Sequence, residues 1–429
     1  MTHQQKYQQF IFKDYSFDEN SKTLTLRYSM DDTLNFVETF KFDFDFVHYD
    51  FRALDRAVQN LFFMAGVSYY KTYAPAKIII NKGKLDQESA DFFSKTYQRG
   101  LGEFWYINNL DPHTPVKFLP NTQILTPAHP TGEGLLASVG GGKDSLVTIE
   151  LLRKDHPKLA TWSLNHKPQL TPLVEHIGLP HYWVERTWDP QIAELNQQDA
   201  MNGHVPISAI FACVSTIVAI LVGKHDVVMS NEQSANEPTL TYQGVEINHQ
   251  YSKSQEFEQD YQALLKHVFG DSLRYYSLLR PLSELRIAEL FAKLAYEKYK
   301  DVFSSCNRAY AHDSHKLFWC GKCPKCAFVF LALTPFVKRE ELETLFHGKN
   351  LLQDPELDKM YEQLLGIAGD KPLECVGEIK ESRAAMTLAQ QQYLELLKYH
   401  FELPDSYDYK TLGSSHMPEE MLRLIISQF

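Results

Sequence analysis

A glycine-rich loop that joins an apolar strand to a helix restricts the fold of this chain more than any other feature. The loop SVGGGKDS occupies residues 138–145, after the apolar segment GLLASVG and before the helical pattern LVTIELLRK. Glycine lets the backbone approach a ligand closely, and the free amide groups at the start of a helix attract phosphate. The strand, loop and helix therefore predict an anion-binding site within an α/β domain.

Short apolar segments alternate with helical patterns from about residue 131 to residue 338. The predicted strands are GLLASVG at 134–140, LATWSLN at 159–165, HYWVERT at 181–187, HDVVMS at 225–230 and RYYSLLRP at 274–281. This alternation is typical of a doubly wound parallel sheet, in which ligands bind at the carboxyl ends of the strands.

Two further regions flank this α/β segment, and a chain of 429 residues is long enough for each to bury a core. Residues 1–130 begin with the alternating segments QQFIFKDYSF and TLTLRYSM around the turn DENSK, which predict a β-hairpin. A third strand, LNFVETFKFD, and helices near 53–70 and 87–110 around AKIIIN predict an α+β accessory or substrate domain. Residues 339–429 are expected to be mainly helical, interrupted by the loop GDKPLECVGE at 369–378.

The charge of the chain limits its partners. A formal net charge of -11, without any basic block, argues against a nucleic-acid surface but allows a small anionic substrate in a local basic pocket. The start of the chain, MTHQQKYQQF, lacks the basic flank and apolar run of a secretory signal. We therefore expect a cytoplasmic protein whose cysteines are reduced.

One apolar stretch, Val205 to Gly223, carries no charge over nineteen residues and approaches the length of a membrane span. It lies between segments predicted to be strands of one sheet, and a membrane crossing would place those strands on opposite sides of the bilayer. A buried helix inside the α/β region is the favoured interpretation.

The loop at 138–145 does not match the Walker A phosphate-binding motif. Ala137 stands where that motif requires its first glycine, and Asp144 replaces the Ser or Thr that follows its lysine. A tight turn without a ligand is the alternative, but three glycines with these flanks favour a phosphate site. The loop resembles that of the PP-loop ATP pyrophosphatase superfamily, which implies an adenine nucleotide α-hydrolase-like fold and cleavage of ATP between its α and β phosphates.

This resemblance implies a set of ligand contacts. The loop residues implied to hold pyrophosphate and Mg²⁺ are Ser138, Gly140, Gly141, Gly142, Asp144 and Ser145. Lys143 adds positive charge, so Lys143 and Asp144 become candidate catalytic residues. In the superfamily the adenine lies near the end of the second strand, which makes Ser163 and Asn165 candidate adenosine contacts. A turn that is polar only for solvation explains those two residues equally well.

Four cysteines are spaced as Cys-x13-Cys-x2-Cys-x2-Cys. They are Cys306, Cys320, Cys323 and Cys326. The Cys-x2-Cys spacing lets two thiolates face one tetrahedral ion, so a structural zinc site is predicted, with unmetallated packing cysteines as the alternative. The same arrangement occurs in the queuosine-pathway cyanodeazaguanine synthases, which also carry a PP-loop.

Three further strings resemble the MurL family of ATP-dependent UDP-N-acetylmuramoyl-L-alanyl-L-glutamate epimerases. They are SNEQSAN at 230–236, NHQYSKS at 248–254 and ECVGE at 374–378. The resemblance implies that ATP adenylates the α-carboxylate of the terminal L-glutamate with release of pyrophosphate. The α-proton is then removed and replaced on the opposite face, and hydrolysis gives AMP and the D-glutamyl product for peptidoglycan synthesis. The implied partner is this small UDP-N-acetylmuramoyl-dipeptide.

An epimerase needs an acid and a base on opposite faces of the carbon, or one group that reaches both. His249 and Cys375 are the candidates, since a nearby cation or helix start can activate a thiol. A structural histidine and a small apolar filler are the respective alternatives.

Polar residues of the same strings complete the candidate site. Glu232 and Glu246 can act as bases or Mg²⁺ ligands. Lys253, Arg280 and Arg308 can neutralise a substrate carboxylate or diphosphate, although a solvated surface charge is the alternative for each. The candidate substrate-binding residues are Asn231, Glu232, Ser234, Asn236, Tyr251, Ser252 and Lys253.

Three classes of function follow from these motifs. The first is an ATP-driven amino-acid epimerase. The second is a PP-loop ligase or nucleobase-modifying enzyme resembling the cyanodeazaguanine synthases, a family that does not account for the first 130 or the last 90 residues. The third is a nucleotide-binding regulatory protein, which would not need the intact glycine loop. The sequence leaves the oligomeric state open.

Overall fold

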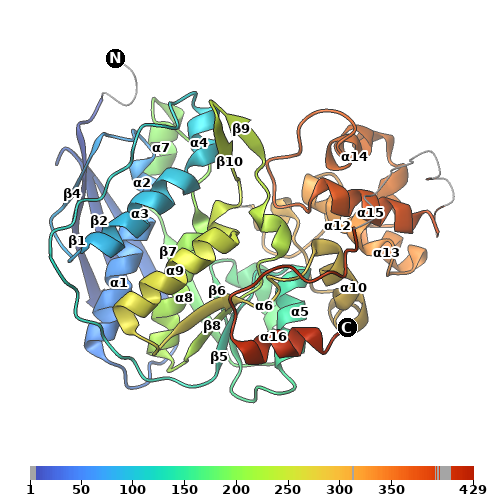
Figure 1. Ribbon diagram of the computed structural model, residues 1–429, viewed down its shortest axis with the longest axis horizontal. Helices are drawn as coiled ribbons and strands as arrows, with labels where there is room; N and C mark the ends of the chain where they lie inside the picture. Colours follow the sequence, from blue (N-terminus) through green and yellow to red (C-terminus); the bar gives the residue numbers. More distant parts are fainter. Residues whose placement is uncertain (1–5, 312–313, 392, 394–395, 397–406) are drawn as a thin grey trace.

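The computed structural model describes residues 6–311, 314–391, 393, 396 and 407–429, and one nine-stranded sheet runs through it (Figure 1). The order across the sheet is β11 (Arg274–Ser277), β8 (Asp226–Met229), β5 (Leu135–Ser138), β6 (Ala160–Leu164), β7 (His181–Thr187), β3 (Leu34–Asp43), β2 (Thr23–Met30), β1 (Gln9–Asp18) and β4 (Lys77–Ile80). All strands predicted from the sequence are present. A two-stranded hairpin, β9 (Leu240–Tyr242) and β10 (Val245–Ile247), stands apart from the sheet.

The five strands from β11 to β7 are all parallel. From β5 the chain proceeds outward through β6 to β7, and it then returns to the other side of β5 to form β8 and β11. The direction of winding therefore reverses between β5 and β8. In a doubly wound sheet such a reversal opens a crevice at the carboxyl ends of the strands, where ligands bind.

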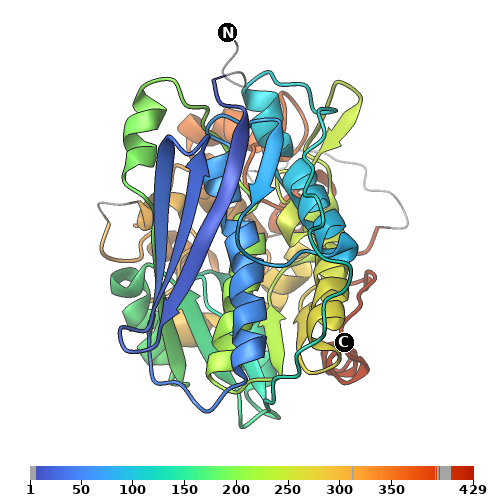
Figure 2. The same cartoon turned by 90° about the vertical axis from the view of Figure 1, so that its left-hand side faces the viewer.

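The parallel sheet expected for residues 131–338 is present in these five strands, but it continues into the first part of the chain, so the sheet as a whole is mixed. β3 pairs with β7 in antiparallel fashion, with Phe42 opposite Val184, and β1, β2 and β3 form an antiparallel meander. This pairing satisfies the backbone groups of β7, which would otherwise be an exposed edge. Figure 2 faces this end of the sheet. The strands on the two sides of residue 130 therefore share one sheet and one hydrophobic core.

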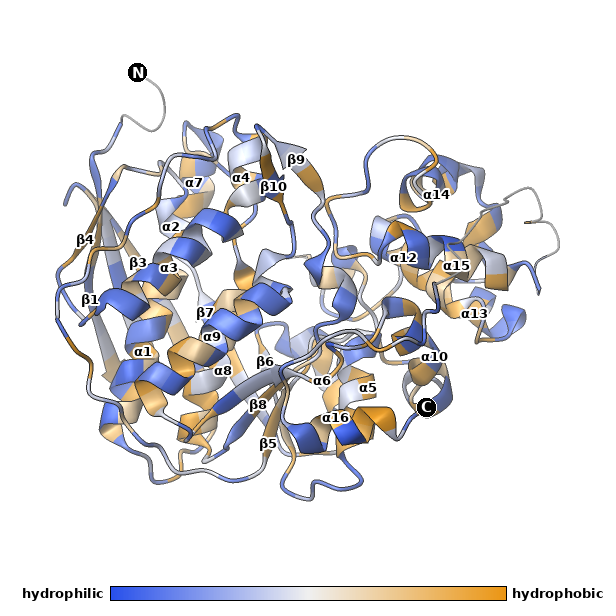
Figure 3. Cartoon of the chain, viewed as in Figure 1, coloured by the Kyte–Doolittle hydropathy of each residue, from blue (hydrophilic) through white to orange (hydrophobic). Residues whose placement is uncertain are grey.

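Helices cover both faces of the sheet because the side chains of a strand alternate between them. In β5, Leu136 packs in the core that contains α1, α3, α8 and α9, whereas Leu135 and Ala137 pack in the core that contains α5, α6, α10 and α12. The bounds are α1 (Phe51–Ala65), α2 (Val67–Tyr70), α3 (Gln87–Gly100), α4 (Gly102–Ile107), α5 (Lys143–Leu152), α6 (Lys167–Ile177), α7 (Gln191–Gln197), α8 (Ile207–Leu221), α9 (Gln255–Phe269), α10 (Glu284–Leu294), α11 (Tyr296–Tyr299) and α12 (Pro324–Leu333). Figure 3 shows hydrophilic residues along the outer sides of α3 and α9.

The uncharged stretch from Val205 to Gly223 forms α8, which is buried along nearly its whole length against α1 and the sheet. The prediction of a buried helix is thus confirmed. Among the described residues, no helix is both long enough and apolar enough to cross a membrane.

Beyond residue 338, the regular elements among the described residues are all helices. Its helices are α13 (Arg339–Leu345), α14 (Asp358–Leu364), α15 (Ile379–Ala389) and α16 (Glu419–Ile426). The segment 369–378 between α14 and α15 has no regular structure and carries Cys375. Figure 1 shows α12 to α15 grouped at the end of the molecule opposite β1 and β4. The helical expectation for residues 397–406 lies outside the described residues.

Candidate active site

The glycine-rich loop lies at the reversal point of the sheet, between β5 and α5. Gly141 has a φ of +86°, and a Cβ atom there would collide with the Tyr310 hydroxyl. That hydroxyl donates to the Gly140 carbonyl at 2.8 Å, and the amide of Ser304 donates to the Gly141 carbonyl at 2.9 Å. Within the described residues no side chain caps α5. The loop is therefore held through its carbonyl groups, and the first amides of α5 remain for an anion.

Lys143 is buried beneath the loop. Its ammonium group forms ion pairs with the carboxylates of Asp144 and Glu284. Burial opposes the charged form of Lys143, but Asp144 and Glu284 outweigh burial and raise its pKa. Lys143 is thus a charged group that links the loop to the start of α10.

Glu284 and Glu381 extend this acidic cluster and were not anticipated from the sequence. Burial raises the pKa of Glu284, which Lys143 partly offsets. The Glu381 carboxylate accepts the backbone amides of Glu284 and Glu378, at 2.8 and 2.7 Å, and so joins the starts of α10 and α15. Burial, with Glu378 and Glu284 nearby, raises the pKa of Glu381 to about 8.

Cys375 lies beside Lys253, with 3.1 Å between Sγ and Nζ. Burial by itself would raise the pKa of the Cys375 thiol, but Lys253 and Lys325, with a hydrogen bond from His249, lower it to about 6. The thiolate is therefore the main form at neutral pH, and thiolates are the reactive form of cysteine.

His249 is hydrogen-bonded to Cys375 and is held by Glu103 of α4. Its Nδ1 atom is hydrogen-bonded to the Glu103 carboxylate. Burial opposes protonation of His249, but Cys375 and Glu103 raise its pKa to about 9. The structure thus brings the two predicted proton-transfer residues together as a thiolate and an imidazolium.

A second histidine completes this cluster. The ring centroid of His204 lies 4.5 Å from that of His249. Burial, together with His249, lowers the pKa of His204 to about 4, so one histidine is charged and its neighbour is neutral at pH 7. Ligand atoms of Glu103, His204 and His249 lie within 4.8 Å of one another, an arrangement that can also hold a metal ion.

Lys253 connects the glycine-rich loop to the Cys375–His249 pair. Burial opposes its charge, whereas Cys375, Glu232 and Asp144 raise its pKa. Lys253 therefore lies within electrostatic reach of both the loop carboxylate and the thiolate. A group bound between the loop and Cys375 would lie against this ammonium.

The four predicted metal ligands converge, with all four Sγ atoms within 4.8 Å of one another. Three of the separations are 3.9 Å for Cys306–Cys323, 3.7 Å for Cys320–Cys326 and 3.5 Å for Cys323–Cys326. Sulfur atoms bound tetrahedrally to zinc at about 2.3 Å lie about 3.8 Å apart. No disulfide forms among the cysteines, all of which are described. The four thiols thus form a candidate metal site.

Several other predicted residues support the scaffold. Arg280 is fully buried and binds the Glu258 carboxylate at 2.8 Å and the carbonyls of Glu232 and Lys253. It therefore fixes both loops, and its charge is already balanced. Ser163 donates to the Val139 carbonyl at 2.8 Å and so supports the glycine-rich loop.

The remaining candidates are spread over three places. Asn231 donates to Ser277 at 3.1 Å, while Ser234 and Ser252 are buried beside Glu232 and Lys253. Asn165, with a φ of +60°, lines a groove of about 1310 Å³ at the ends of β6 and β7. Arg308 lines an adjoining cavity of about 720 Å³, which shares Ala311, Ser314 and His315 with this groove.

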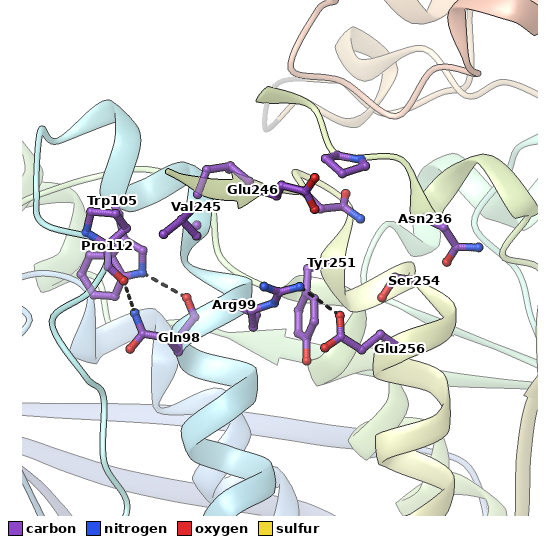
Figure 4. Close-up of a pocket in the computed structure, with 14 residues that line it drawn as sticks. Gln98, Arg99, Trp105, Pro112, Asn236, Val245, Glu246, Tyr251, Ser254 and Glu256 are labelled. Atoms are coloured by element: carbon purple, nitrogen blue, oxygen red, sulfur yellow. Dashed lines mark hydrogen bonds and ion pairs between the residues drawn. The ribbon is translucent and has the colours of Figure 1, made fainter. Parts of the chain in front are cut away.

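A pocket of about 270 Å³ lies at the base of the β9–β10 hairpin (Figure 4). It is lined by Asn236, Tyr251 and Glu246, and on its wall Arg99 pairs with Glu256 at 3.2 Å. The structure therefore places these three predicted residues around a pocket, and Glu246 does not join the acidic cluster at the glycine-rich loop.

Comparison with known proteins identifies the family of this chain. Residues 1–278 match the MurL N-terminal domain, and residues 302–396 match the MurL C-terminal domain. A relative from Xanthomonas oryzae pv. oryzae (strain MAFF 311018) is 40% identical over 391 residues, which cover 88% of this chain and 85% of the relative. A relative from Salinispora tropica is 40% identical over 345 residues, or 79% of this chain and 74% of the relative. Both are named UDP-N-acetyl-alpha-D-muramoyl-L-alanyl-L-glutamate epimerase, and this chain belongs to the MurL family.

Proposed function

We propose that this chain epimerises the terminal glutamate of UDP-N-acetylmuramoyl-L-alanyl-L-glutamate, using ATP to adenylate its α-carboxylate. Family membership supports the reaction and the substrate. One observation supports the mechanism above all: Lys253 joins an anion-binding loop to a thiolate–imidazolium pair. A single site thus contains groups suited to activating a carboxylate and groups suited to moving a proton.

ATP binds with its phosphates on the glycine-rich loop, and its adenosine lies toward Asn165 at the end of β6. The loop's place at the reversal point of the sheet supports a PP-loop type of fold. Asp144, Glu232 and Glu284 offer the carboxylate oxygens that Mg²⁺ prefers. When bound, Mg²⁺ neutralises phosphate charge.

Adenylation begins when an oxygen of the substrate α-carboxylate attacks the α-phosphorus of ATP. The bond between the α-phosphorus and the bridging oxygen to the β-phosphorus breaks, and pyrophosphate leaves. The resulting mixed anhydride has no negative charge on its carbonyl group, so the adjacent α-proton becomes far more acidic. Lys253 lies where it can stabilise the negative charge that develops on the carbonyl oxygen.

Proton transfer follows from the ionisation states of the pair. With a pKa of about 6, Cys375 is ready to accept the α-proton, and with a pKa of about 9, His249 is ready to donate one to the opposite face. After one turnover Cys375 is a thiol and His249 is neutral. Hydrolysis of the anhydride releases AMP and the D-glutamyl product. Once the product no longer separates the two side chains, the hydrogen bond between them forms again and the proton passes from Cys375 to His249.

The four-cysteine cluster fits a structural zinc ion, because four thiolates fill the tetrahedral coordination of zinc. Bound zinc would hold the segment after α11 to the start of α12. Ser304 and Tyr310, which grip the glycine-rich loop, lie in that segment. A zinc ion there would support the loop and would take no part in the chemistry.

The test is incubation of the protein with Mg-ATP and UDP-N-acetylmuramoyl-L-alanyl-L-glutamate, followed by acid hydrolysis and chiral analysis of the glutamate. We expect D-glutamate together with AMP and pyrophosphate. AMP accumulation with only L-glutamate would reject the epimerase and favour a ligase. D-glutamate formed without ATP would reject the adenylation step.

A further inference from the structure

The groove at the ends of β6 and β7 extends well past the glycine-rich loop. It begins at Tyr310, which contacts the loop, and Asn165, and it reaches Lys71 and Asn202 on another wall. Its volume of about 1310 Å³ exceeds the roughly 300–1,000 Å³ of an ordinary small-molecule pocket. The groove therefore has room for a ligand beyond ATP.

Lys71, at the end of α2, is a buried cation without a counter-ion. Only 6% of the residue is exposed, and its ammonium donates to the neutral side chain of Asn202 at 2.7 Å. No carboxylate pairs with it in the described part of the chain, and burial lowers its pKa to about 8. A buried charge of this kind is costly unless an opposite charge joins it. An anionic ligand in the groove would supply that charge.

Arg186 of β7 approaches the same wall. Its Nη2 atom donates to Ser68 at 3.0 Å, and Ser68 lies one helical turn before Lys71. Its Nε atom pairs with Glu38, but its Nη1 atom is buried and has no hydrogen-bond partner among the residues described. Arg186 is therefore neutralised by Glu38 and closed off from solvent, and it holds Ser68 of α2 in place beside the groove.

An exposed aromatic ring lies against Arg186. Trp188 lines the groove with 44% of its surface exposed, and the Arg186 guanidinium carbon lies 5.0 Å from its ring centroid, so the buried cation holds the indole in place. An exposed indole is suited to stack on the base of a nucleotide whose phosphates bind a nearby cation. The groove thus combines a stacking surface, Trp188, with one phosphate donor, Lys71.

We propose that Lys71 and Trp188 bind the nucleoside diphosphate end of the substrate, with Arg186 positioning Trp188. The assignment rests on the proposed function, because it places the other end of the same molecule. Asn202, which holds Lys71, lies two residues before His204 of the cluster around His249. A substrate with its diphosphate on Lys71 therefore extends toward the proton-transfer pair.

Titration calorimetry with UDP as the probe tests this assignment. Lys71→Met keeps the length of the side chain and removes its charge, so we expect UDP to bind about 10- to 100-fold more weakly, as for loss of a charge-assisted hydrogen bond. ATP should bind as to the wild type. Lys77→Met is the matched control, because Lys77 is exposed on β4 and does not line the groove.

A second variant tests the assignment in case Lys71→Met does not fold. Trp188→Ala changes an exposed side chain, and we expect it also to weaken UDP binding. Unchanged UDP affinity in a folded Lys71→Met protein or in Trp188→Ala would overturn the assignment, and so would an equal loss of ATP affinity. Wild-type protein that binds UDP through Lys71 but forms no D-glutamate would instead contradict the proposed function alone.

Discussion

The Nζ atom of Lys253 lies 3.1 Å from the Sγ atom of Cys375, although 122 positions separate the two residues in the chain. Lys253 comes from the short helical turn after β10, and Cys375 comes from the irregular segment before α15. Their contact brings the carboxyl-terminal helices to the edge of the nucleotide loop. It also lowers the pKa of the Cys375 thiol, to which we assign removal of the α-proton.

Replacing Lys253 by methionine should raise the pKa of Cys375, because Lys253 is the strongest of the groups that favour the thiolate. Alkylation of Cys375 by iodoacetamide at pH 7 should then slow, and its pH midpoint should move upward. Lys266→Met, on an exposed part of α9, is the matched control. A midpoint that stays near pH 6 in Lys253→Met would show that Lys253 does not activate the thiol.

Cys375→Ser and His249→Gln should separate adenylation from inversion. In the wild type we expect solvent deuterium to enter the glutamyl α-position only when ATP is present. In each variant we expect incorporation to fall about 100- to 10,000-fold, the usual contribution of a general acid or base. AMP release should continue, because the glutamyl adenylate that is not inverted is still hydrolysed.

The control for this pair is His48→Gln, since His48 is exposed and away from the cluster. Deuterium exchange at nearly the wild-type rate in both Cys375→Ser and His249→Gln would disprove their assignment. Glu103 and His204 would then be the next groups to replace.

Asp144→Ala should abolish release of AMP and pyrophosphate without unfolding the protein. Asp144 stands at the start of α5 beside the phosphate loop, where a carboxylate serves Mg²⁺ better than packing. Chromatography of the nucleotide products and a thermal melt are the measurements, with exposed Asp155→Ala as the control. ADP and orthophosphate as the only products of the wild type would contradict the superfamily assignment.

One zinc ion per chain should be found by elemental analysis of protein purified without chelator. Cys320→Ser should lose the metal and lower the melting temperature, because structural zinc contributes folding energy. Tyr310→Phe is the informative partner variant, since it removes the hydroxyl on Gly140 and leaves the thiols intact. We expect it to raise the KM for ATP at full zinc content.

The zinc site itself would be excluded if the wild-type protein contained no zinc and its four cysteines titrated as free thiols.

Short sequence motifs predicted much of this site. The glycine-rich loop and the cysteine cluster were predictable because each is defined by spacing within a short segment. The strands were predictable from alternation, but the pairing of β3 with β7 was not, because alternation selects a buried face and names no partner.

Glu103 and His204 were missed because each is a single titratable residue far from every motif. Only one signal pointed to Glu103, namely a carboxylate inside the apolar and aromatic helix GEFWYI, where it is 8% exposed. A buried charge in such a helix requires a partner, and His249 is that partner. The sequence therefore indicated that Glu103 needs a partner, but it could not show that the partner is His249.

The rate of inversion should fall at both low and high pH, because Cys375 sets the acidic limb of the pH profile and His249 sets the alkaline limb. Below about pH 6 Cys375 is protonated and cannot accept the α-proton, and above about pH 9 His249 is neutral and cannot donate one. Deuterium incorporation should therefore be highest between these values and fall on both sides. Lys253→Met should move the acidic limb upward, because the thiol pKa rises. Glu103→Gln should move the alkaline limb downward, because Glu103 helps to raise the pKa of His249. If neither variant shifted either limb of the pH profile, groups other than Cys375 and His249 would set the limbs. The assignment of Cys375 as the base and His249 as the acid would then be wrong.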